Sequence, residues 1–212
     1  MIKAVVFDLD GTLTNTLGDI ASSMNRALRL NGLPEHEERA YTKMIGDGVF
    51  KLVERAVGDH PDKLDAVYQT YQAYYSQHAM DTTHPYDGVH EMLLALAERG
   101  ISLCVFSNKP HADTVNVVAK FFPDVPFWMV RGQMPGFPVK PNPAGALVIA
   151  QSVGAEPDEF LYLGDMAVDM QCAQNADMHG VAVTWGFGDR ASLEASPAEH
   201  IIDTPMQVLD LL

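Results

Sequence analysis

Short apolar segments alternate with helical patterns along most of this chain, and this alternation constrains the fold more than any other feature. Apolar runs with the length of buried strands lie at Lys3–Phe7, Ser102–Phe106, Phe127–Val130, Phe160–Leu163 and Val181–Thr184. Helical patterns lie between these runs, at Val89–Glu98, His111–Phe121, Ala144–Ser152 and Val168–Asn175. Strands that alternate with helices form a parallel sheet with helices on both faces. The sequence therefore predicts an α/β fold with a Rossmann-like, doubly wound parallel sheet.

One long helical stretch interrupts the alternation directly after the first strand. Its apolar residues have helical spacing at Asp19–Arg29, Val49–Val57 and Leu64–His78, and no strand pattern intervenes. Ligands in open α/β sheets bind at the carboxyl ends of the strands, where an insertion at this point would lie. We therefore predict a core formed by residues 1–14 and 84–212, with residues 15–83 as a small helical cap.

Two carboxylates, Asp8 and Asp10, stand at the end of the first strand. Residues i and i+2 of a strand point to the same side, so both acids would emerge together. Their repulsion is costly unless a cation neutralises it or one acid holds a proton. Gly11 then allows a tight turn and a close approach of the backbone to a ligand. The segment fits a metal-assisted phosphoryl-transfer site; the alternative is an acidic strand end that turns into a solvent-exposed loop.

Polar residues also follow other strands of the predicted sheet. Ser107 and Asn108 come after one strand, Lys140 precedes a helix, and Asp165 and Asp169 follow the strand at Phe160–Leu163. Taken alone, each of these is ordinary loop or helix-end chemistry. Together they place four acids at one edge of the sheet, which requires a hard cation, and oxygen ligands with retained water favour Mg²⁺.

Composition excludes several classes of partner. The formal net charge is −14, which is unsuited to a nucleic-acid backbone and gives no long-range attraction for an anionic substrate. No apolar run is long enough to span a bilayer, and no signal-peptide pattern is readable, so we expect no membrane contact and a cytoplasmic location. The two cysteines, Cys104 and Cys172, lie in apolar patterns typical of core residues. The sequence carries no signal for an oligomeric state.

In its order of motifs the chain resembles the haloacid dehalogenase superfamily. The motifs are Asp8-Leu9-Asp10-Gly11-Thr12, Ser107-Asn108, Lys140-Pro141 and Gly164-Asp165 with Asp169. The resemblance extends over nearly the whole length, helical insertion included. Within the superfamily the chain is most similar to the phosphoglycolate phosphatases, on the segments Ile45-Gly46-Asp47-Gly48 and Lys140-Pro141-Asn142-Pro143.

This resemblance implies a mechanism and a set of site residues. Asp8 would attack phosphorus, and Asp10 would act as general acid and then general base. Mg²⁺ would be held by Asp8, the backbone carbonyl of Asp10 and Asp165, while Asp169 would orient water or pair with Lys140. The phosphate would contact Gly11, Thr12, Ser107, Asn108 and Lys140. In the cap, Lys43 and Gly46 would face a small phosphorylated metabolite, with 2-phosphoglycolate as the leading candidate.

Other functions stay open from the sequence. A β-phosphoglucomutase-like phosphotransferase would share the core and would require a bisphosphate activator. A phosphate- or Mg²⁺-binding regulatory module without turnover is a further alternative. A metal-free dehalogenase fits less well, because Asp10 and the gathered acids would then have no purpose.

Overall fold

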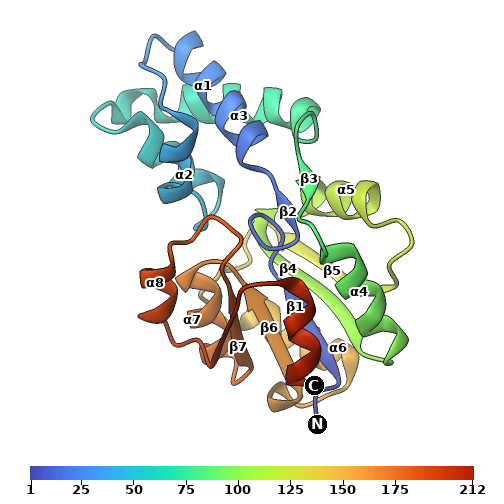
Figure 1. The fold of residues 1–212 in the computed structure, drawn as a ribbon. Coiled ribbons are helices and arrows are strands. Elements are labelled where there is room, and N and C mark those ends of the chain that lie inside the picture. Colours follow the sequence, from blue (N-terminus) through green and yellow to red (C-terminus); the bar gives the residue numbers. More distant parts are fainter.

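The computed structural model describes residues 1–212 and contains a six-stranded parallel sheet (Figure 1). Its strand order is β5-β4-β1-β6-β7-β8. The strands are β1 (Ala4–Phe7), β4 (Ser102–Pro110), β5 (Phe127–Gln133), β6 (Phe160–Gly164), β7 (His179–Val183) and β8 (His200–Ile202). The predicted parallel sheet is therefore confirmed.

Helices cover both faces of this sheet, because successive residues of a strand point to opposite sides. Val5 and Phe7 of β1 belong to one hydrophobic cluster, to which α4 (Val89–Glu98) and α5 (His111–Phe121) contribute. Ala4 and Val6 belong to another, shared with α6 (Ala144–Val153) and α7 (Ala167–Asn175). Since these strands are buried on both faces, they read as continuous apolar runs. The predicted doubly wound architecture is confirmed.

The central strand β1 brings distant parts of the chain to one edge. Phe7 is in register with Val105 of β4 on one side and with Leu163 of β6 on the other. The chain builds β4 and β5 on one side of β1 and then crosses to build β6 on the other. Residues that follow β1 and β6 therefore meet where the winding reverses, which is where α/β sheets bind ligands.

The helical segment between β1 and β4 has a hydrophobic core of its own. It contains α1 (Leu17–Leu30), α2 (Val49–Val57) and α3 (Leu64–His78), with short 3-10 helices η1 (Glu38–Lys43) and η2 (Pro61–Lys63). All fifteen buried residues of this cluster lie between Ile20 and Ala79. In Figure 1 these helices stand beyond the carboxyl ends of the strands, at the end of the molecule opposite to the two termini.

Two short strands connect the helical segment to the rest of the chain. β2 (Thr14–Asn15) and β3 (His84–Pro85) pair antiparallel, with Thr14 opposite Pro85. Next to them the buried Asp19 carboxylate accepts hydrogen bonds from the backbone N–H and hydroxyl groups of Thr82 and Thr83, at 2.7–3.1 Å. Burial alone would raise the pKa of Asp19, but these hydrogen bonds outweigh it and lower the pKa.

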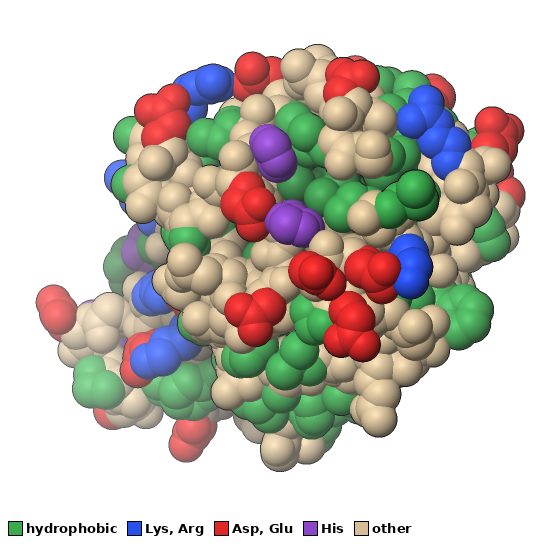
Figure 2. All heavy atoms as spheres, turned by 90° about the horizontal axis from the view of Figure 1, so that it is seen from below, with side chains coloured by type: hydrophobic (Ala, Val, Ile, Leu, Met, Phe, Trp, Pro, Cys, Tyr) green, Lys and Arg blue, Asp and Glu red, His purple; other side chains and the backbone are tan.

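Several elements at the end of the chain follow no pattern that we identified in the sequence. These are β8, the five-residue α8 (Arg190–Glu194), and the 3-10 helices η3 (Pro157–Glu159) and η4 (Pro205–Leu211). None of the helices is both long and apolar enough to cross a membrane. Acidic side chains are spread over the face that carries the termini (Figure 2), in keeping with the net charge of −14.

Candidate active site

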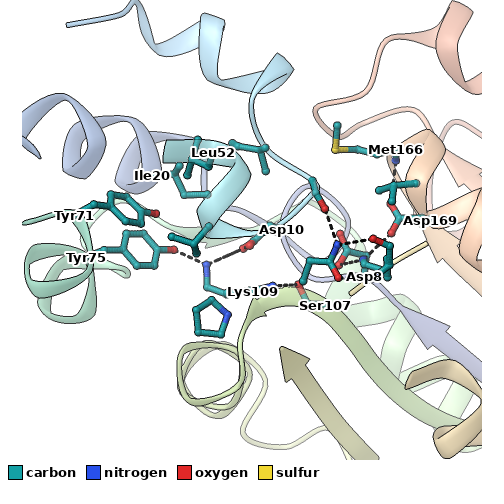
Figure 3. Close-up of a pocket in the computed structure, with 18 residues that line it drawn as sticks. Asp8, Asp10, Ile20, Leu52, Tyr71, Tyr75, Ser107, Lys109, Met166 and Asp169 are labelled. Atoms are coloured by element: carbon teal, nitrogen blue, oxygen red, sulfur yellow. Dashed lines mark hydrogen bonds and ion pairs between the residues drawn. The ribbon is translucent and has the colours of Figure 1, made fainter. Parts of the chain in front are cut away.

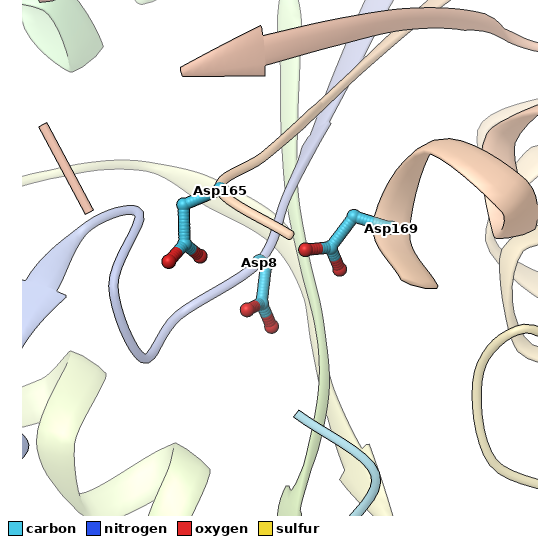
Figure 4. Close-up of side chains that lie close together, drawn as sticks. All are labelled: Asp8, Asp165 and Asp169. Carbon is cyan, nitrogen blue, oxygen red and sulfur yellow. The ribbon is translucent and has the colours of Figure 1, made fainter. Parts of the chain in front are cut away.

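Three acidic side chains gather at the edge where β1 and β6 end. Asp8 follows β1, Asp165 follows β6, and Asp169 lies in the first turn of α7. Their carboxylate oxygens lie within 4.8 Å of one another, and all three residues are buried (Figure 4). The fourth predicted acid, Asp10, points its carboxylate to the other side, toward Lys109.

Lys140 is the cation of this acidic cluster. Its ammonium donates to Asp8 Oδ1 and to Asp169 Oδ1, at 2.7 Å each, and its side chain is only 1% exposed. Burial would lower the pKa of Lys140, but the two facing carboxylates raise it above its ordinary value. Lys140 therefore stays charged and neutralises part of the cluster.

The charged forms of Asp165 and Asp8 are disfavoured in this buried cluster. Burial, with Asp169 and Asp8 nearby, raises the pKa of Asp165 well above its ordinary value. Asp165 accepts hydrogen bonds from the Thr12 hydroxyl (3.1 Å) and the Phe187 N–H (2.7 Å), and it makes no ion pair. Burial also raises the pKa of Asp8 to about 7, although Lys140 opposes this.

These residues fit a hard divalent cation. The cluster has three buried carboxylates and one lysine, which contacts only Asp8 and Asp169, so it lacks positive charge. Its donors are oxygen atoms, the ligands that Mg²⁺ prefers. A bound cation of this kind would favour the ionised form of both Asp8 and Asp165. The donor set therefore matches the metal that the sequence analysis expects.

Close backbone contacts hold Asp165 in place. Gly11 has φ +91°, and a Cβ at this position would lie 2.2 Å from an Asp165 oxygen. From the other side, a Cβ on Gly186 would lie 2.3 Å from Asp165 Cβ. Trp185 Nε1 donates to the Thr12 carbonyl (3.0 Å), which fixes the Thr12 loop. Gly11 and Thr12 thus pack around the acidic cluster.

Asn108 links the loop of Lys140 to the helical segment. Its Oδ1 accepts from the Lys140 backbone N–H (2.8 Å), and its Nδ2 donates to the Lys140 carbonyl (3.3 Å) and the Gly46 carbonyl (2.9 Å). Ser107 accepts a hydrogen bond from the Lys109 backbone N–H at its Oγ (3.3 Å) and lines the same cavity as Asp8. Asn108 is thereby committed to protein partners, whereas the Ser107 hydroxyl retains donor capacity toward the cavity.

The helical segment closes over this edge and leaves a cavity of about 50 Å³, room for a few water-sized groups. Figure 3 shows the core side chains on one wall and helical-segment side chains on the other. The core contributes Asp8, Asp10, Ser107, Lys140 and Asp169; the helical segment contributes Ile20, Ile45, Gly46, Gly48, Val49, Leu52, Tyr71 and Tyr75. Gly46 therefore lines the cavity, and its predicted contact with substrate stays a prediction.

Lys43 does not line this cavity. It is exposed at the end of η1 and borders a larger, adjoining cleft of about 730 Å³, between η1 and the loop that contains Phe187. Its predicted contact with substrate stays a prediction.

Two cavity residues, Lys109 and Tyr75, were not predicted as site residues. The Lys109 side chain is 3% exposed, and its ammonium contacts both Asp10 oxygens and the Tyr75 hydroxyl. In the sequence Lys109 follows Ser107-Asn108 at a strand end, and Tyr75 belongs to a stripe of tyrosines with helical spacing. Neither pattern shows that the two side chains meet, because Tyr75 lies in α3 of the helical segment and Lys109 in β4 of the sheet.

Comparisons with known proteins agree with this geometry. Residues 5–183 match the family described as "Haloacid dehalogenase-like hydrolase". The chain is 31% identical over 220 residues to the phosphoglycolate phosphatase of Haemophilus influenzae strain 86-028NP, covering 99% of this chain and 98% of that protein. It is 28% identical to that of Pectobacterium atrosepticum, covering 100% and 92%. A crystal structure of a predicted phosphoglycolate phosphatase from Haemophilus somnus 129pt has a TM-score of 0.92 at 29% identity, covering 99% and 97%.

Proposed function

The chain belongs to the haloacid dehalogenase-like hydrolase family and is one of its phosphatases, and on this premise we propose that it is an Mg²⁺-dependent hydrolase of a small phosphate monoester. The observation that carries the proposal is the contact of Asp8 with Lys140 (2.7 Å) beside Asp165 and Asp169. A carboxylate held against an ammonium group and a cation-binding cluster is placed to act as a nucleophile toward a phosphoryl group.

Asp8 begins the reaction. Its free oxygen attacks phosphorus in line with the ester oxygen, the P–O bond to the leaving group breaks, and an aspartyl-phosphate forms on Asp8. Asp10 donates a proton to the departing oxygen, then takes a proton from the water that hydrolyses the aspartyl-phosphate. Phosphate leaves and Asp8 is regenerated, so the two half-reactions balance.

Positive charge and hydrogen-bond donors stabilise the phosphoryl group during transfer. Lys140 and the Ser107 hydroxyl lie on the cavity wall beside Asp8. The backbone N–H groups of Gly11 and Thr12 instead donate to the carbonyls of Thr14 (2.8 Å) and Leu9 (3.3 Å). Asp8, Asp165 and Asp169, with the backbone carbonyl of Asp10, would hold Mg²⁺. When bound, the cation supplies charge that shields the anionic nucleophile from the anionic phosphoryl group.

The helical segment would act as a cap that limits the substrate. Residues 15–83 lie over the core of residues 1–14 and 84–212 and leave a cavity of only about 50 Å³. A cavity of this size favours small soluble monophosphates over phosphoproteins and excludes bulk water. The two relatives from Haemophilus influenzae and Pectobacterium atrosepticum are phosphoglycolate phosphatases, so 2-phosphoglycolate is the leading substrate. Gly46 lies on the cavity wall and Lys43 beside the larger cleft. A cytoplasmic location remains a prediction.

Phosphate release from a panel of small esters tests the function. We expect the purified protein to release phosphate with Mg²⁺, to stop in EDTA, and to recover when Mg²⁺ is restored; Ca²⁺ should support it poorly because its shell is larger and more flexible. The Asp8→Asn protein is the control for contaminating phosphatases. Full activity after exhaustive chelation contradicts the dependence on Mg²⁺. Turnover that requires a bisphosphate activator indicates a phosphotransferase.

A further inference from the structure

The cavity contains a second buried lysine that the proposed mechanism leaves without a role. Only two basic side chains line the cavity, Lys109 and Lys140. Lys140 already pairs with Asp8 and Asp169. The Lys109 side chain is 3% exposed and lies away from that cluster, on the other side of Asp10 in the view of Figure 3. A buried lysine is retained only where partners or a ligand compensate for lost hydration.

Lys109 is fixed from both sides. Its ammonium donates to Asp10 Oδ1 (3.1 Å) and Oδ2 (3.2 Å) on the core and contacts the Tyr75 hydroxyl on α3. Tyr75 is itself fixed, since its ring stacks on Tyr71 with a centroid distance of 5.2 Å. An ammonium group has three N–H donors, and the partners of Lys109 are one carboxylate and one hydroxyl, which leaves a donor for an incoming acceptor when one N–H group serves both Asp10 oxygens.

The surroundings of Lys109 strengthen its attraction for an anion. Ile20, Leu52 and Tyr71 form the apolar wall of the cavity on the helical side. A charge beside such a wall acts through a lower effective dielectric constant than one in water. Lys140, the other cation of the cavity, is paired with two carboxylates, whereas Lys109 is paired with one. An anionic group that enters here therefore meets Lys109.

The position of Asp10 tells which part of a substrate would reach Lys109. As the proton donor, Asp10 contacts the leaving oxygen, while Asp8 contacts phosphorus. The substituent of the leaving group therefore extends past Asp10, on the side away from Asp8, where Lys109 lies. We propose that Lys109, held between Tyr75 and Asp10, is the specificity-determining cation that binds a carboxylate on the leaving group. This inference rests on the proposed function and assigns its substrate class: phosphate esters of short hydroxy acids.

Recognition by this pair also depends on the cap. Tyr75 belongs to the helical segment and Lys109 to β4 of the core, so their contact exists only while the segment lies over the sheet. An anionic leaving group that binds Lys109 would therefore meet a cation already positioned by closure. Tyr75 acts as a positioning residue, through Lys109.

Two esters of equal length isolate the carboxylate: 2-phosphoglycolate and 2-hydroxyethyl phosphate, which has a hydroxymethyl group in its place. The readout is a selectivity ratio, kcat/KM for the first ester divided by kcat/KM for the second. If replacing Lys109 also disturbs Asp10, the disturbance affects both esters in the same way and cancels in this ratio. We expect Lys109→Met to lower the ratio roughly 10- to 100-fold, as for loss of a hydrogen bond between charged groups.

Two further variants sharpen the test. Tyr75→Phe keeps the ring and the lysine but loses the hydroxyl, so the ratio should fall by a smaller factor, mainly through KM for 2-phosphoglycolate. This variant also decides the matter if Lys109→Met fails to fold. Lys120→Met, at an exposed lysine outside the cavity, is the matched control and should keep the wild-type ratio. An unchanged ratio in both Lys109→Met and Tyr75→Phe, or a fall in Lys43→Met instead, overturns the inference.

A binding measurement separates this inference from the proposed function. Should the wild-type protein hydrolyse neither ester, the proposed function fails, and calorimetric titration of the Asp8→Asn protein with both esters still tests Lys109. Tighter binding of 2-phosphoglycolate that is lost on adding Lys109→Met supports the inference. Equal affinity for the two esters contradicts it.

Discussion

Lys140 and Asp8 are joined by a 2.7 Å hydrogen bond between residues 132 positions apart in the chain. The bond connects the end of the central strand to a loop that precedes α6, and the same ammonium reaches Asp169 at 2.7 Å. One lysine thus holds the proposed nucleophile and a second carboxylate in fixed positions, so its loss should affect both activity and folding.

Replacing Lys140 by Met should abolish turnover and lower the free energy of unfolding by about 3 kcal/mol or more in EDTA, because two buried carboxylates lose their counter-charge. Urea unfolding with and without Mg²⁺ measures the effect, and Mg²⁺ should restore part of the loss. Lys51→Met, at an exposed lysine paired with Glu54, is the matched control and should change stability little. A Lys140→Met protein as stable as the wild type would show that the cluster needs no cation.

The Asp8→Asn substitution should separate chemistry from stability. Turnover should fall by roughly a thousand-fold or more, since an amide cannot form the aspartyl-phosphate. The asparagine oxygen can still accept from Lys140, so the metal-free protein should unfold at the same urea concentration as the wild type or a higher one. Single-turnover phosphate release and urea unfolding give the two readouts. Retention of a substantial fraction of the wild-type rate would exclude Asp8 as the nucleophile.

Stability of the metal-free protein should fall as pH rises. The pKa of Asp8 is raised from 3.8 to about 7 in the folded chain, chiefly by burial, so the folded protein binds more protons than the unfolded one between those values. The stability that protonated Asp8 contributes is fully present below about pH 4 and is lost as the pH rises through about 7. Melting temperatures in EDTA should decline over this window, and Mg²⁺ should raise them more at pH 8 than at pH 5.

Asp8→Asn is the internal control for this titration. Because asparagine does not titrate, its melting temperature in EDTA should depend less steeply on pH in the same window. Identical curves for the two proteins would mean that Asp8 ionises normally.

Asp19→Ala should loosen the connection between the helical segment and the core. The change leaves the N–H and hydroxyl groups of Thr82 and Thr83 without their acceptor and should cost about 2 to 4 kcal/mol of unfolding free energy. Urea unfolding and limited proteolysis near residue 82 test it. Asp65→Ala, at an exposed acid in the first turn of α3, is the control. Equal stability of the two variants would contradict an anchoring role for Asp19.

The cluster of buried acids could be predicted because its residues follow strand ends. Asp8 and Asp165 each come directly after an apolar run, and a parallel sheet brings such ends together whatever lies between them in the chain. The sequence analysis expects Asp169 to orient water or to pair with Lys140, and the structure contains the ion pair with Lys140. The prediction of four gathered acids was less accurate, since Asp10 turns toward Lys109, a partner the i, i+2 argument does not include.

Contacts between the helical segment and the sheet could not be predicted in the same way. Tyr75 meets Lys109, and Gly46 meets Asn108, through the packing of two separate hydrophobic clusters. Periodicity gives the helix of Tyr75 but not how that helix is seated over the sheet. Lys43 shows the same limit, because its placement beside the larger cleft depends on the path of η1. The short edge strand β8 lacks a long apolar run because it packs at the sheet margin.

The paired strands β2 and β3 have a consequence for how this protein is put together. Thr14 and Pro85 are direct register partners, so the chain leaves the α/β fold and re-enters it at almost the same point. The roughly seventy residues between them therefore form a segment whose two ends join the α/β fold at one place. A segment attached in this way can be replaced by one of different shape without altering the path of the sheet. Substrate choice can therefore evolve separately from the chemistry.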